Sequence, residues 1–428
     1  MDIGSVSEKR KGRAVSGSPD NGRLVDRWLG RLASCPIAHC QGEFWQYGQG
    51  LWHARAEGQI RQQLLGVAEE SRAEGVKVTG GLISSMLQLV RDKCDIDKGA
   101  FRPDPNRLVC TNGALDLKAR QLEPWSREHY ALHGVAYDYD PEAKRPGFDR
   151  YLADLSLGAD VIAFLQEFAG YCLTGDTRYE RAVWLQGPPG SGKSTLIEGI
   201  QAALSDRWCT LGLADIERSQ FRLWNLPGKT LAVATEQPSG YLRTEHLLNR
   251  LISGETITIE RKHQDSYDFS PQVKLLWAMN DLPISTDTAN GIFRRVSIVR
   301  FPALKGAADP SLKEQIKGEG AGILNWCLDG LERLNQRGRF DLPEVVQEAT
   351  VQFRDGCDVE KAFADERLKL GPDLMIRSRD LYALYATWCR ESGHKAKSLT
   401  RIAEDWSRLG LRRDRDRLGK LYWGAEEG

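Results

Sequence analysis

The stretch that most constrains how this chain can fold runs from Arg181 to Thr195 and reads RAVWLQGPPGSGKST. Its first part, Ala182–Gln186, is a short apolar run that ends at glycine and proline, which is typical of a fully buried strand. Gly187 then opens a phosphate-loop pattern, which Lys193 and Ser194 complete. The sequence therefore predicts a buried strand that delivers the chain directly into a phosphate-binding loop.

The residue types in this loop suit the binding of phosphate groups. Glycines let backbone N–H groups turn toward a phosphate, and a helix-like run over Thr195–Leu204 adds the positive end of its dipole. Lys193 supplies a mobile charge for the β- and γ-phosphates, and the Ser194 hydroxyl can ligate Mg²⁺. We expect these residues to contact the nucleotide: Gly187, Pro188, Pro189, Gly190, Ser191, Gly192, Lys193, Ser194 and Thr195.

Three further apolar runs read as buried strands of the same sheet, at Leu231–Ala234, Val273–Met279 and Ser297–Phe301. Glu236 follows the first, where an NTPase keeps the acid that holds Mg²⁺ through water and polarises the attacking water. Asn280 follows the second, where an amide can orient that water or sense the γ-phosphate. The strands and the loop helix together predict an α/β fold.

Two groups of basic residues lie near these strands. Arg294 and Arg295 precede the last strand; they either form surface salt bridges or serve as a finger that completes a neighbour's ATP site, which requires a guanidinium. A hairpin is expected over 256–269, and its polar tip contains Arg261, Lys262 and His263. The tip is either a solvated turn or a finger that grips a phosphate backbone.

Composition narrows the class of protein. A chain of 428 residues with zero net charge should hold two to four domains around sizeable cores. No apolar run approaches the roughly 20 residues of a membrane span, and the N-terminus lacks a secretory h-region. Nine cysteines without a CxxC pair point to reduced thiols. We therefore expect a cytoplasmic protein with no membrane partner.

Three weaker signals have a structural interpretation that we prefer. Two cysteines and a histidine within 35–40 hint at metal, but no second ligand pair follows at zinc-finger spacing. The DxD pairs at 95–97 and 138–140 could hold the two metals of a primase, but no polymerase-sized domain surrounds them. Aromatic residues of a hairpin expected over Phe44–Trp52 could stack on bases; we interpret them as the core of a small domain.

The rest of the chain is predicted from its periodicity. Residues 1–23 are polar and basic and should be a disordered tail. Arg107–Pro124 reads as two strand-like pieces around turns. Helices are expected over four segments: Gln59–Ser71, Gly81–Cys94, Phe148–Gly175 and Leu312–Asn335.

The C-terminal segment carries an uneven charge. Lys395–Lys420 contains nine basic and four acidic residues, a net charge of +5. Helices are expected over Leu381–Cys389 and Leu399–Leu409, then a basic turn over Arg412–Lys420 and a short strand over Leu421–Trp423. Two helices followed by a basic wing predict a winged-helix-like module that binds DNA.

Taken in order, these motifs resemble superfamily 3 helicases, most nearly the phage- and plasmid-encoded primase-helicases, with poxvirus primase-helicases and small DNA tumour virus helicases more distant. GPPGSGKST resembles motif A, LAVATEQ at 231–237 motif B, and LLWAMNDLP at 275–283 motif C. The resemblance covers about 44–338 well. Its remaining pieces are NGALDL at 112–117, YDYDP at 137–141, LISGETITIERKH at 251–263, GIFRRVSIVRF at 291–301 and GEGAGILNW at 318–326.

The resemblance implies roles for individual residues. Ser194 and Glu236 would hold Mg²⁺, with Glu236 as the catalytic acid. Arg294 would be the finger that acts on a neighbouring subunit, with Arg295 as the alternative. The catalytic residues implied are Lys193, Glu236, Asn280, Arg294 and Arg295, and those implied to touch DNA in a central channel are Arg261, Lys262 and His263. Motif B often carries two acids, whereas Gln237 follows Glu236 here.

The resemblance also implies an architecture and an activity. An N-terminal α+β domain would span 24–147, an AAA+-like P-loop ATPase domain with a parallel sheet flanked by helices 148–338, and the winged-helix-like domain 339–428. The protein would be an ATP-dependent, ring-forming DNA helicase or translocase that replicates a phage, plasmid or other mobile element.

Its partners would be single-stranded or forked DNA, copies of itself in a homo-hexamer, and a separate primase or polymerase, since the residues before Phe44 are too few to hold a primase. The setting would be the cytoplasm of a bacterial or phage-infected cell. Two alternatives stay open: a P-loop ATPase that acts in remodelling or defence without unwinding, and a nucleotide-gated scaffold that binds an origin.

Overall fold

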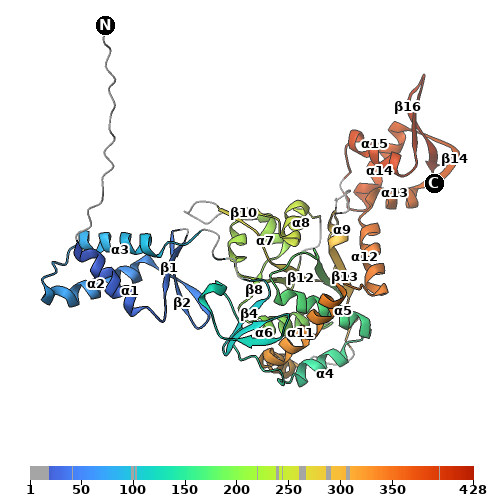
Figure 1. Ribbon diagram of the computed structural model, residues 1–428. Helices are drawn as coiled ribbons and strands as arrows, with labels where there is room; N and C mark the ends of the chain where they lie inside the picture. The colour runs from blue at the N-terminus through green and yellow to red at the C-terminus, as the bar shows by residue number, and fades with distance from the viewer. Residues whose placement is uncertain are drawn as a thin grey trace, which may run out of the picture.

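The computed structural model has three parts that lie in a row: an N-terminal module, a central α/β core and a C-terminal module (Figure 1). The residues that it describes are 19–40, 42–97, 101, 104–218, 220–237, 241–242, 244–259, 267–285, 291–304, 309–394 and 396–428. No helix among them is long and apolar enough to cross a membrane.

The N-terminal module packs three helices against a small antiparallel sheet of order β1-β2-β3. The expected Phe44–Trp52 hairpin is confirmed, and its aromatic residues Phe44 and Trp52 are buried. The first helix begins at Pro19, so the last residues of the expected tail are helical, because Leu24 and Val25 are buried in this core. The elements are α1 Pro19–Arg31, β1 Ile37–Cys40, β2 Glu43–Gly48, β3 Leu51–Arg55, α2 Glu57–Glu70, the 3-10 helix η1 Ser71–Glu74 and α3 Gly80–Cys94.

A second antiparallel sheet, of order β4-β5-β6, lies beside the central core, on the side of the N-terminal module (Figure 1). Where the sequence predicted two strands there are three, because a turn after Asp116 returns the chain into a short β6. Leu108 and Leu115 of this sheet are buried in the same hydrophobic cluster as the core helices. The elements are β4 Arg107–Cys110, β5 Gly113–Asp116, β6 Gln121–Glu123 and the 3-10 helix η2 Arg127–His129.

The central core is a five-stranded, fully parallel sheet of order β13-β7-β12-β9-β8, with helices on both faces. The predicted parallel sheet is therefore confirmed, and the sequence missed only its short edge strand β8. Alternate residues of β7 face opposite sides, with Val183 in one cluster and Trp184 in the other, as expected for a sheet buried on both faces. The strands are β7 Ala182–Gln186, β8 Trp208–Thr210, β9 Leu231–Ala234, β12 Lys274–Met279 and β13 Val296–Arg300.

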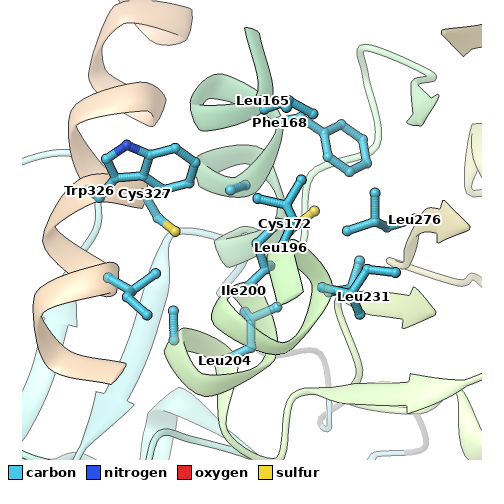
Figure 2. Close-up of a cluster of buried hydrophobic side chains, with 14 of the residues drawn as sticks. Leu165, Phe168, Cys172, Leu196, Ile200, Leu204, Leu231, Leu276, Trp326 and Cys327 are labelled. Carbon is cyan, nitrogen blue, oxygen red and sulfur yellow. The ribbon is translucent and has the colours of Figure 1, made fainter. Parts of the chain in front are cut away.

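Three helices, α5, α6 and α11, cover one face of the sheet, and Figure 2 shows their side chains converging with Leu231 and Leu276 of the strands. The core helices and the small hairpin are α4 Pro146–Asp154, α5 Ala159–Leu173, α6 Lys193–Leu204, α7 Leu213–Arg218, η3 Gln220–Asn225, α8 Glu245–Ser253, β10 Ile257–Ile259, β11 Tyr267–Phe269, α9 Gly291–Arg295, α10 Pro310–Gly318 and α11 Gly320–Arg337.

Two helices expected to be continuous are each broken. The segment predicted over Phe148–Gly175 divides into α4 and α5, because Gly158 adopts an extended conformation before α5. The segment predicted over Leu312–Asn335 divides into α10 and α11 at Glu319. The Glu319 carboxylate accepts hydrogen bonds from the backbone N–H groups of Gly147 and Phe148, both at 2.8 Å, and so caps the first turn of α4.

The C-terminal module follows α12, which packs on β13, and forms a helical cluster on an antiparallel sheet of order β14-β16-β15. The two predicted helices are confirmed as α14 and α15. The prediction of a basic turn is wrong, because Arg412–Asp416 is a strand that pairs with the longer β16. The elements are α12 Glu344–Gly356, α13 Val359–Arg367, β14 Leu368–Arg377, α14 Ser378–Glu391, α15 Leu399–Arg408, β15 Arg412–Asp416 and β16 Gly419–Glu427.

Candidate active site

The phosphate loop is tied to the strands on both sides of β7. The Gly187 N–H donates to the carbonyl of Met279 at the end of β12, at 3.2 Å. A Cβ atom at Gly187 would lie 2.3 Å from the carbonyl oxygen of Phe301, which directly follows β13. Only glycine therefore fits where the loop passes the end of β13. Gly192 has a φ of 91°, which turns the chain into α6. The loop is therefore held in place by β12 and β13 before any ligand binds.

Lys193 lies folded over this loop and is 7 % exposed. Its Nζ donates to the carbonyls of Gly187 at 2.6 Å and Pro188 at 2.9 Å, and to the Ser191 hydroxyl at 3.2 Å. Burial lowers the pKa of Lys193, and among the described residues no carboxylate is paired with its ammonium. A buried cation that meets only neutral oxygens fits an anionic ligand such as the phosphates of a nucleotide.

Asn280 lies beside this ammonium. It is the first residue after β12, which pairs with β7 so that Met279 is opposite Gln186. The Asn280 Oδ1 is 3.5 Å from Lys193 Nζ, and its side chain is exposed at the edge of the sheet where the loop lies. The structure thus brings together two residues that are 87 positions apart and that the sequence singled out separately.

Glu236 lies on the other side of β12. It follows β9, whose Ala234 pairs with Trp277, so its backbone reaches the same edge of the sheet as the loop. Glu236 is exposed and makes no hydrogen bond or ion pair with the described part of the chain. Gln237 has a structural contact instead, because its Oε1 accepts from the Leu213 N–H at 3.0 Å at the start of α7. The residue after Glu236 therefore holds the start of α7.

Two of these residues could hold Mg²⁺. Ser194 is half-buried in the first turn of α6, and Glu236 faces solvent at the same sheet edge. A hydroxyl and one carboxylate suit Mg²⁺, which keeps several waters and otherwise binds substrate phosphates. Within the described residues no group of three or more His, Cys, Asp or Glu could hold a metal ion. In the 35–40 segment, where the sequence hinted at metal, His39 Nδ1 is hydrogen-bonded to Asp95 Oδ1 at 3.1 Å.

The paired arginines differ in their surroundings. Arg294 is exposed at the end of α9. Arg295 is 7 % exposed; it forms an ion pair with Glu180 at 2.7 Å and donates from Nε to the Ser253 hydroxyl at 3.0 Å. Both precede β13, whose first residue, Val296, pairs with the first residue of β7. The arginines therefore lie at the edge of the sheet formed by the N-terminal ends of the strands. The phosphate loop lies at the opposite edge, formed by the C-terminal ends, about 13 Å away along β7.

The predicted DNA-binding residues Arg261, Lys262 and His263 lie outside the described residues. The strands that flank them are described. β10 pairs antiparallel with β11, with Ile257 opposite Phe269. The predicted hairpin is confirmed up to its tip.

Two residues near the loop were not found from the sequence. The Tyr151 hydroxyl donates to the Gly192 carbonyl at 2.9 Å, and burial raises the pKa of this phenol. Arg300, at the end of β13, donates from Nε to the Gln186 side chain at 3.3 Å. Tyr151 follows Phe148 by three residues in an apolar stripe, which is the spacing of helix packing. Arg300 lies within the predicted strand Ser297–Phe301, and nothing in that pattern distinguishes it as a residue near the loop.

Two family descriptions match parts of the chain. The family "D5 N terminal like" matches residues 23–157, and a family of unknown function, DUF5906, matches residues 185–295. The second match contains the phosphate loop, Glu236, Asn280 and both arginines.

Two curated viral proteins are similar in sequence. A putative helicase, L207/L206, of Acanthamoeba polyphaga mimivirus is 23 % identical over 333 residues, which cover 70 % of this chain and 32 % of that protein. A putative helicase, 121R, of Invertebrate iridescent virus 3 is 25 % identical over 171 residues, which cover 33 % of this chain and 18 % of that protein. The chain thus spans about a third or less of the length of these relatives.

Solved structures of the NrS-1 C-terminal region have the same fold. One apo structure superposes with a TM-score of 0.55 at 12 % identity and covers 96 % of this chain and all of that chain. Another, called the A form, gives a TM-score of 0.54 at 11 % identity, with 94 % and 97 % covered. The D5 match, the two viral relatives and this shared fold support the resemblance of the chain to primase-helicases of phages and viruses.

Proposed function

We propose that this protein is an ATP-dependent DNA helicase or translocase that works as a ring of identical subunits in the replication of a phage, plasmid or other mobile element. The observation that carries the proposal is the division of the site between two edges of one sheet. Lys193, Asn280 and Glu236 gather at one edge, and the exposed Arg294 lies at the other. A second subunit is needed to bring these parts together.

Within one nucleotide site, the residues of the chain would have separate roles in binding ATP and in its hydrolysis. A bound ATP with Mg²⁺ supplies the phosphoryl group that is transferred to water. Lys193 would leave its carbonyl partners and bind the β- and γ-phosphates, and the Ser194 hydroxyl would ligate Mg²⁺. Glu236, which has no competing partner in the described part of the chain, would accept the proton of the attacking water. Asn280 would orient that water from its place beside Lys193.

Arg294 would act on the site of the adjacent subunit. Its guanidinium stabilises charge on the transferred phosphoryl group, a contribution that is worth about 10³–10⁵ in kcat in enzymes that use such a finger. Its exposure, and its distance from its own chain's loop, support this role in trans. Arg295 is buried in an ion pair with Glu180, which supports Arg294 as the finger and a structural role for its neighbour.

Two surfaces are proposed to bind DNA. The tip of the β10–β11 hairpin would present Lys262 and His263 to phosphates in the channel of the ring. The C-terminal module would bind duplex DNA through the β15–β16 hairpin, on which Arg413 and Arg415 are exposed and form no ion pair with described residues. Phosphate contacts of this kind give affinity without base specificity.

Strand displacement on a forked duplex tests the activity, with the Lys193→Ala protein as the control. The proposal expects unwinding that requires ATP and Mg²⁺ and is absent from the control. ATP hydrolysis that DNA does not stimulate, without strand displacement, would instead indicate a remodelling or defence ATPase. Nucleotide binding without any turnover would indicate an origin-binding scaffold.

Mixing two inactive variants tests the shared site. Lys193→Ala subunits keep their finger, and Arg294→Ala subunits keep their loop. Neither should hydrolyse ATP alone, whereas a mixture should regain activity at roughly a quarter of its interfaces if subunits mix at random around the ring. No recovery in mixtures shown to contain mixed rings would refute a finger that acts between subunits.

A further inference from the structure

Two consecutive residues just before β7 bind the two consecutive arginines just before β13. The Glu180 carboxylate pairs with the Arg295 guanidinium at 2.7 Å. The Arg181 Nη1 donates to the backbone carbonyl of Arg294 at 3.0 Å, and it is 3.4 Å from the Ser297 hydroxyl. The short segment that carries Arg294 is therefore attached to the start of the strand whose other end carries the phosphate loop.

The surroundings of Arg181 are unusual for a cation. Its Nε is shielded from solvent and has no hydrogen-bond partner in the described part of the chain. Burial lowers the pKa of Arg181, and the described residues supply no carboxylate within ion-pair distance to compensate. Arg181 is half-buried, and even partial burial of a guanidinium without a counter-ion costs free energy, so ion pairing does not explain an arginine here. Its hydrogen bond to the backbone carbonyl of Arg294, which holds that carbonyl in one place, does explain an arginine here.

The helix that carries Arg294 needs such support. α9 spans five residues, Gly291–Arg295, and a helix this short is not stable without tertiary contacts. A cation at the C-terminal end of a helix binds its unpaired carbonyls and complements its dipole. Arg181 occupies this position at the carbonyl of Arg294.

The turn before Arg181 is held in a strained form. Glu180 has a φ of 42°, which is uncommon for a residue with a side chain, and its N–H donates to the Thr177 carbonyl at 2.9 Å. This conformation directs Glu180 to Arg295 and lets Arg181 reach Arg294. The four residues form one clamp between the starts of β7 and β13.

We propose that Arg181 is a positioning residue for the finger: it holds the backbone of Arg294 so that the Arg294 side chain extends from the subunit surface toward the neighbouring site. This inference rests on the proposed trans role of Arg294. Arg181 touches no substrate in this arrangement. It should matter only in the subunit that donates the finger, and not in the subunit that hydrolyses ATP.

A directional mixing experiment tests this. The donor is the Arg181→Met/Lys193→Ala double variant, which cannot use its own loop, and the acceptor is Arg294→Ala. We expect this donor to restore at least tenfold less ATPase activity than Lys193→Ala alone. In the reverse arm, the Arg181→Met/Arg294→Ala acceptor should be restored by the Lys193→Ala donor as fully as Arg294→Ala is.

Controls separate positioning from a general loss of structure. Arg178→Ala/Lys193→Ala is the matched donor, because Arg178 is an exposed arginine three residues away whose Nε is paired with Asp176 at 2.8 Å; it should restore full activity. Arg181→Lys keeps one donor and the charge, and it should restore an intermediate level. Size-exclusion chromatography and thermal unfolding establish that each variant is folded and enters rings.

The outcomes are distinct. Failure of the parent mixture, Lys193→Ala with Arg294→Ala, would overturn the trans finger and this inference with it. If the parent mixture works and Arg181→Met donates as well as its parent, the positioning role is wrong. Equal loss in the donor and acceptor arms, for Arg181→Met and Arg181→Lys alike, would also overturn it, because a purely structural residue affects both arms.

Discussion

The ammonium of Lys193 lies 3.5 Å from the side-chain oxygen of Asn280. This contact joins the loop after β7 to the end of β12, and it places an amide beside the cation that would bind phosphate. The remaining Lys193 contacts are to neutral oxygens of its own loop. The ammonium is thus held close to its proposed working position without a competing negative charge.

Asn280→Asp should impair nucleotide binding, whereas Asn280→Ala should impair turnover. A carboxylate at this distance would form an ion pair with Lys193 and would repel the phosphates, so we expect ATP affinity to fall at least tenfold, about 1.4 kcal/mol. Alanine removes the amide that orients water and adds no charge, so affinity should change by less than a few-fold while kcat falls. Titration of a fluorescent nucleotide together with steady-state ATPase rates would measure both. Equal affinities for the two variants would contradict this account.

Adjacent arginines should give opposite phenotypes. Arg294→Ala removes an exposed side chain and should lower kcat by about 10³-fold or more, with nucleotide binding and the free energy of unfolding unchanged. Arg295→Ala removes a buried guanidinium with three bonds, to Glu180, Ser253 and Gly291, and should destabilise the fold by roughly 2 kcal/mol or more. Urea unfolding and ATPase assays on both proteins check this. A stable but inactive Arg295→Ala protein would reverse the assignment.

Much of the central core was predictable because its apolar runs are short and end at glycine, proline or a polar residue. Ala182–Gln186 has this form and is a strand, and Val273–Met279 has it and contains the strand Lys274–Met279. Their order in the sheet was not predictable, because nothing local places β12 between β7 and β9. Trp208–Thr210 was missed because three residues are too few to form a pattern.

The remaining misses concern contacts between distant segments. The apolar spacing continues across Gly158 and Glu319, so periodicity predicted single helices where the chain turns. The roles of Gln237 and Arg181 depend on a backbone N–H and a carbonyl that are remote in sequence. Backbone partners of this kind have no residue signature, so they emerge only from the fold.

One glycine in α11, Gly330, should stabilise the fold more than alanine would, although alanine is the better helix former. A Cβ at Gly330 would lie 2.2 Å from the carbonyl of Gln166 in α5, where the two helices approach closely. Gly330→Ala should therefore destabilise the protein by roughly 1–3 kcal/mol. Gly66→Ala in α2 is the matched control, since a Cβ there meets nothing within 4 Å, and it should stabilise by about 0.5–1 kcal/mol. Chemical unfolding would compare the two; a stabilised Gly330→Ala protein would disprove the close contact.

Lys274 should make stability depend on pH. It is 2 % exposed at the start of β12, donates to the Gln272 carbonyl at 3.0 Å and lies 4.6 Å from the centre of the Tyr171 ring. Burial lowers the pKa of Lys274 to about 7, and the nearby charge of Arg207 adds to this while Cys172 and Asp176 oppose it. An unfolded lysine titrates near 10.4, so between about pH 7 and 10 the unfolded chain binds one more proton than the folded chain.

Stability from this group should therefore rise with pH across that window, on the order of 1 kcal/mol per pH unit at most, and should not change below about pH 6. Lys274→Met removes the titration, so its stability relative to the natural protein should be greatest near pH 6 and should decline toward pH 9. Urea midpoints at three pH values would follow the difference. A difference that is constant with pH would show that Lys274 stays charged in the folded protein.

Charge removal from the β15–β16 hairpin should weaken DNA binding without affecting ATP hydrolysis in the absence of DNA. Arg413, Arg415 and Arg417 are exposed and form no ion pair with described residues, whereas Arg408 is paired with Asp358 at 2.5 Å. If each free arginine binds one phosphate of a duplex, the triple alanine variant should lower the slope of log K against log salt by about 2–3.

Fluorescence anisotropy on a labelled duplex between 50 and 200 mM salt, on the order of the range over which phosphate contacts are lost, would measure this slope. Arg408→Ala serves as the control, because its guanidinium is already engaged and its loss should leave the slope nearly unchanged. An unchanged slope in the triple variant would mean that these arginines do not meet phosphate, and the module would then be expected to bind protein. A similar fall in both variants would indicate a general effect of net charge rather than contacts made by the hairpin.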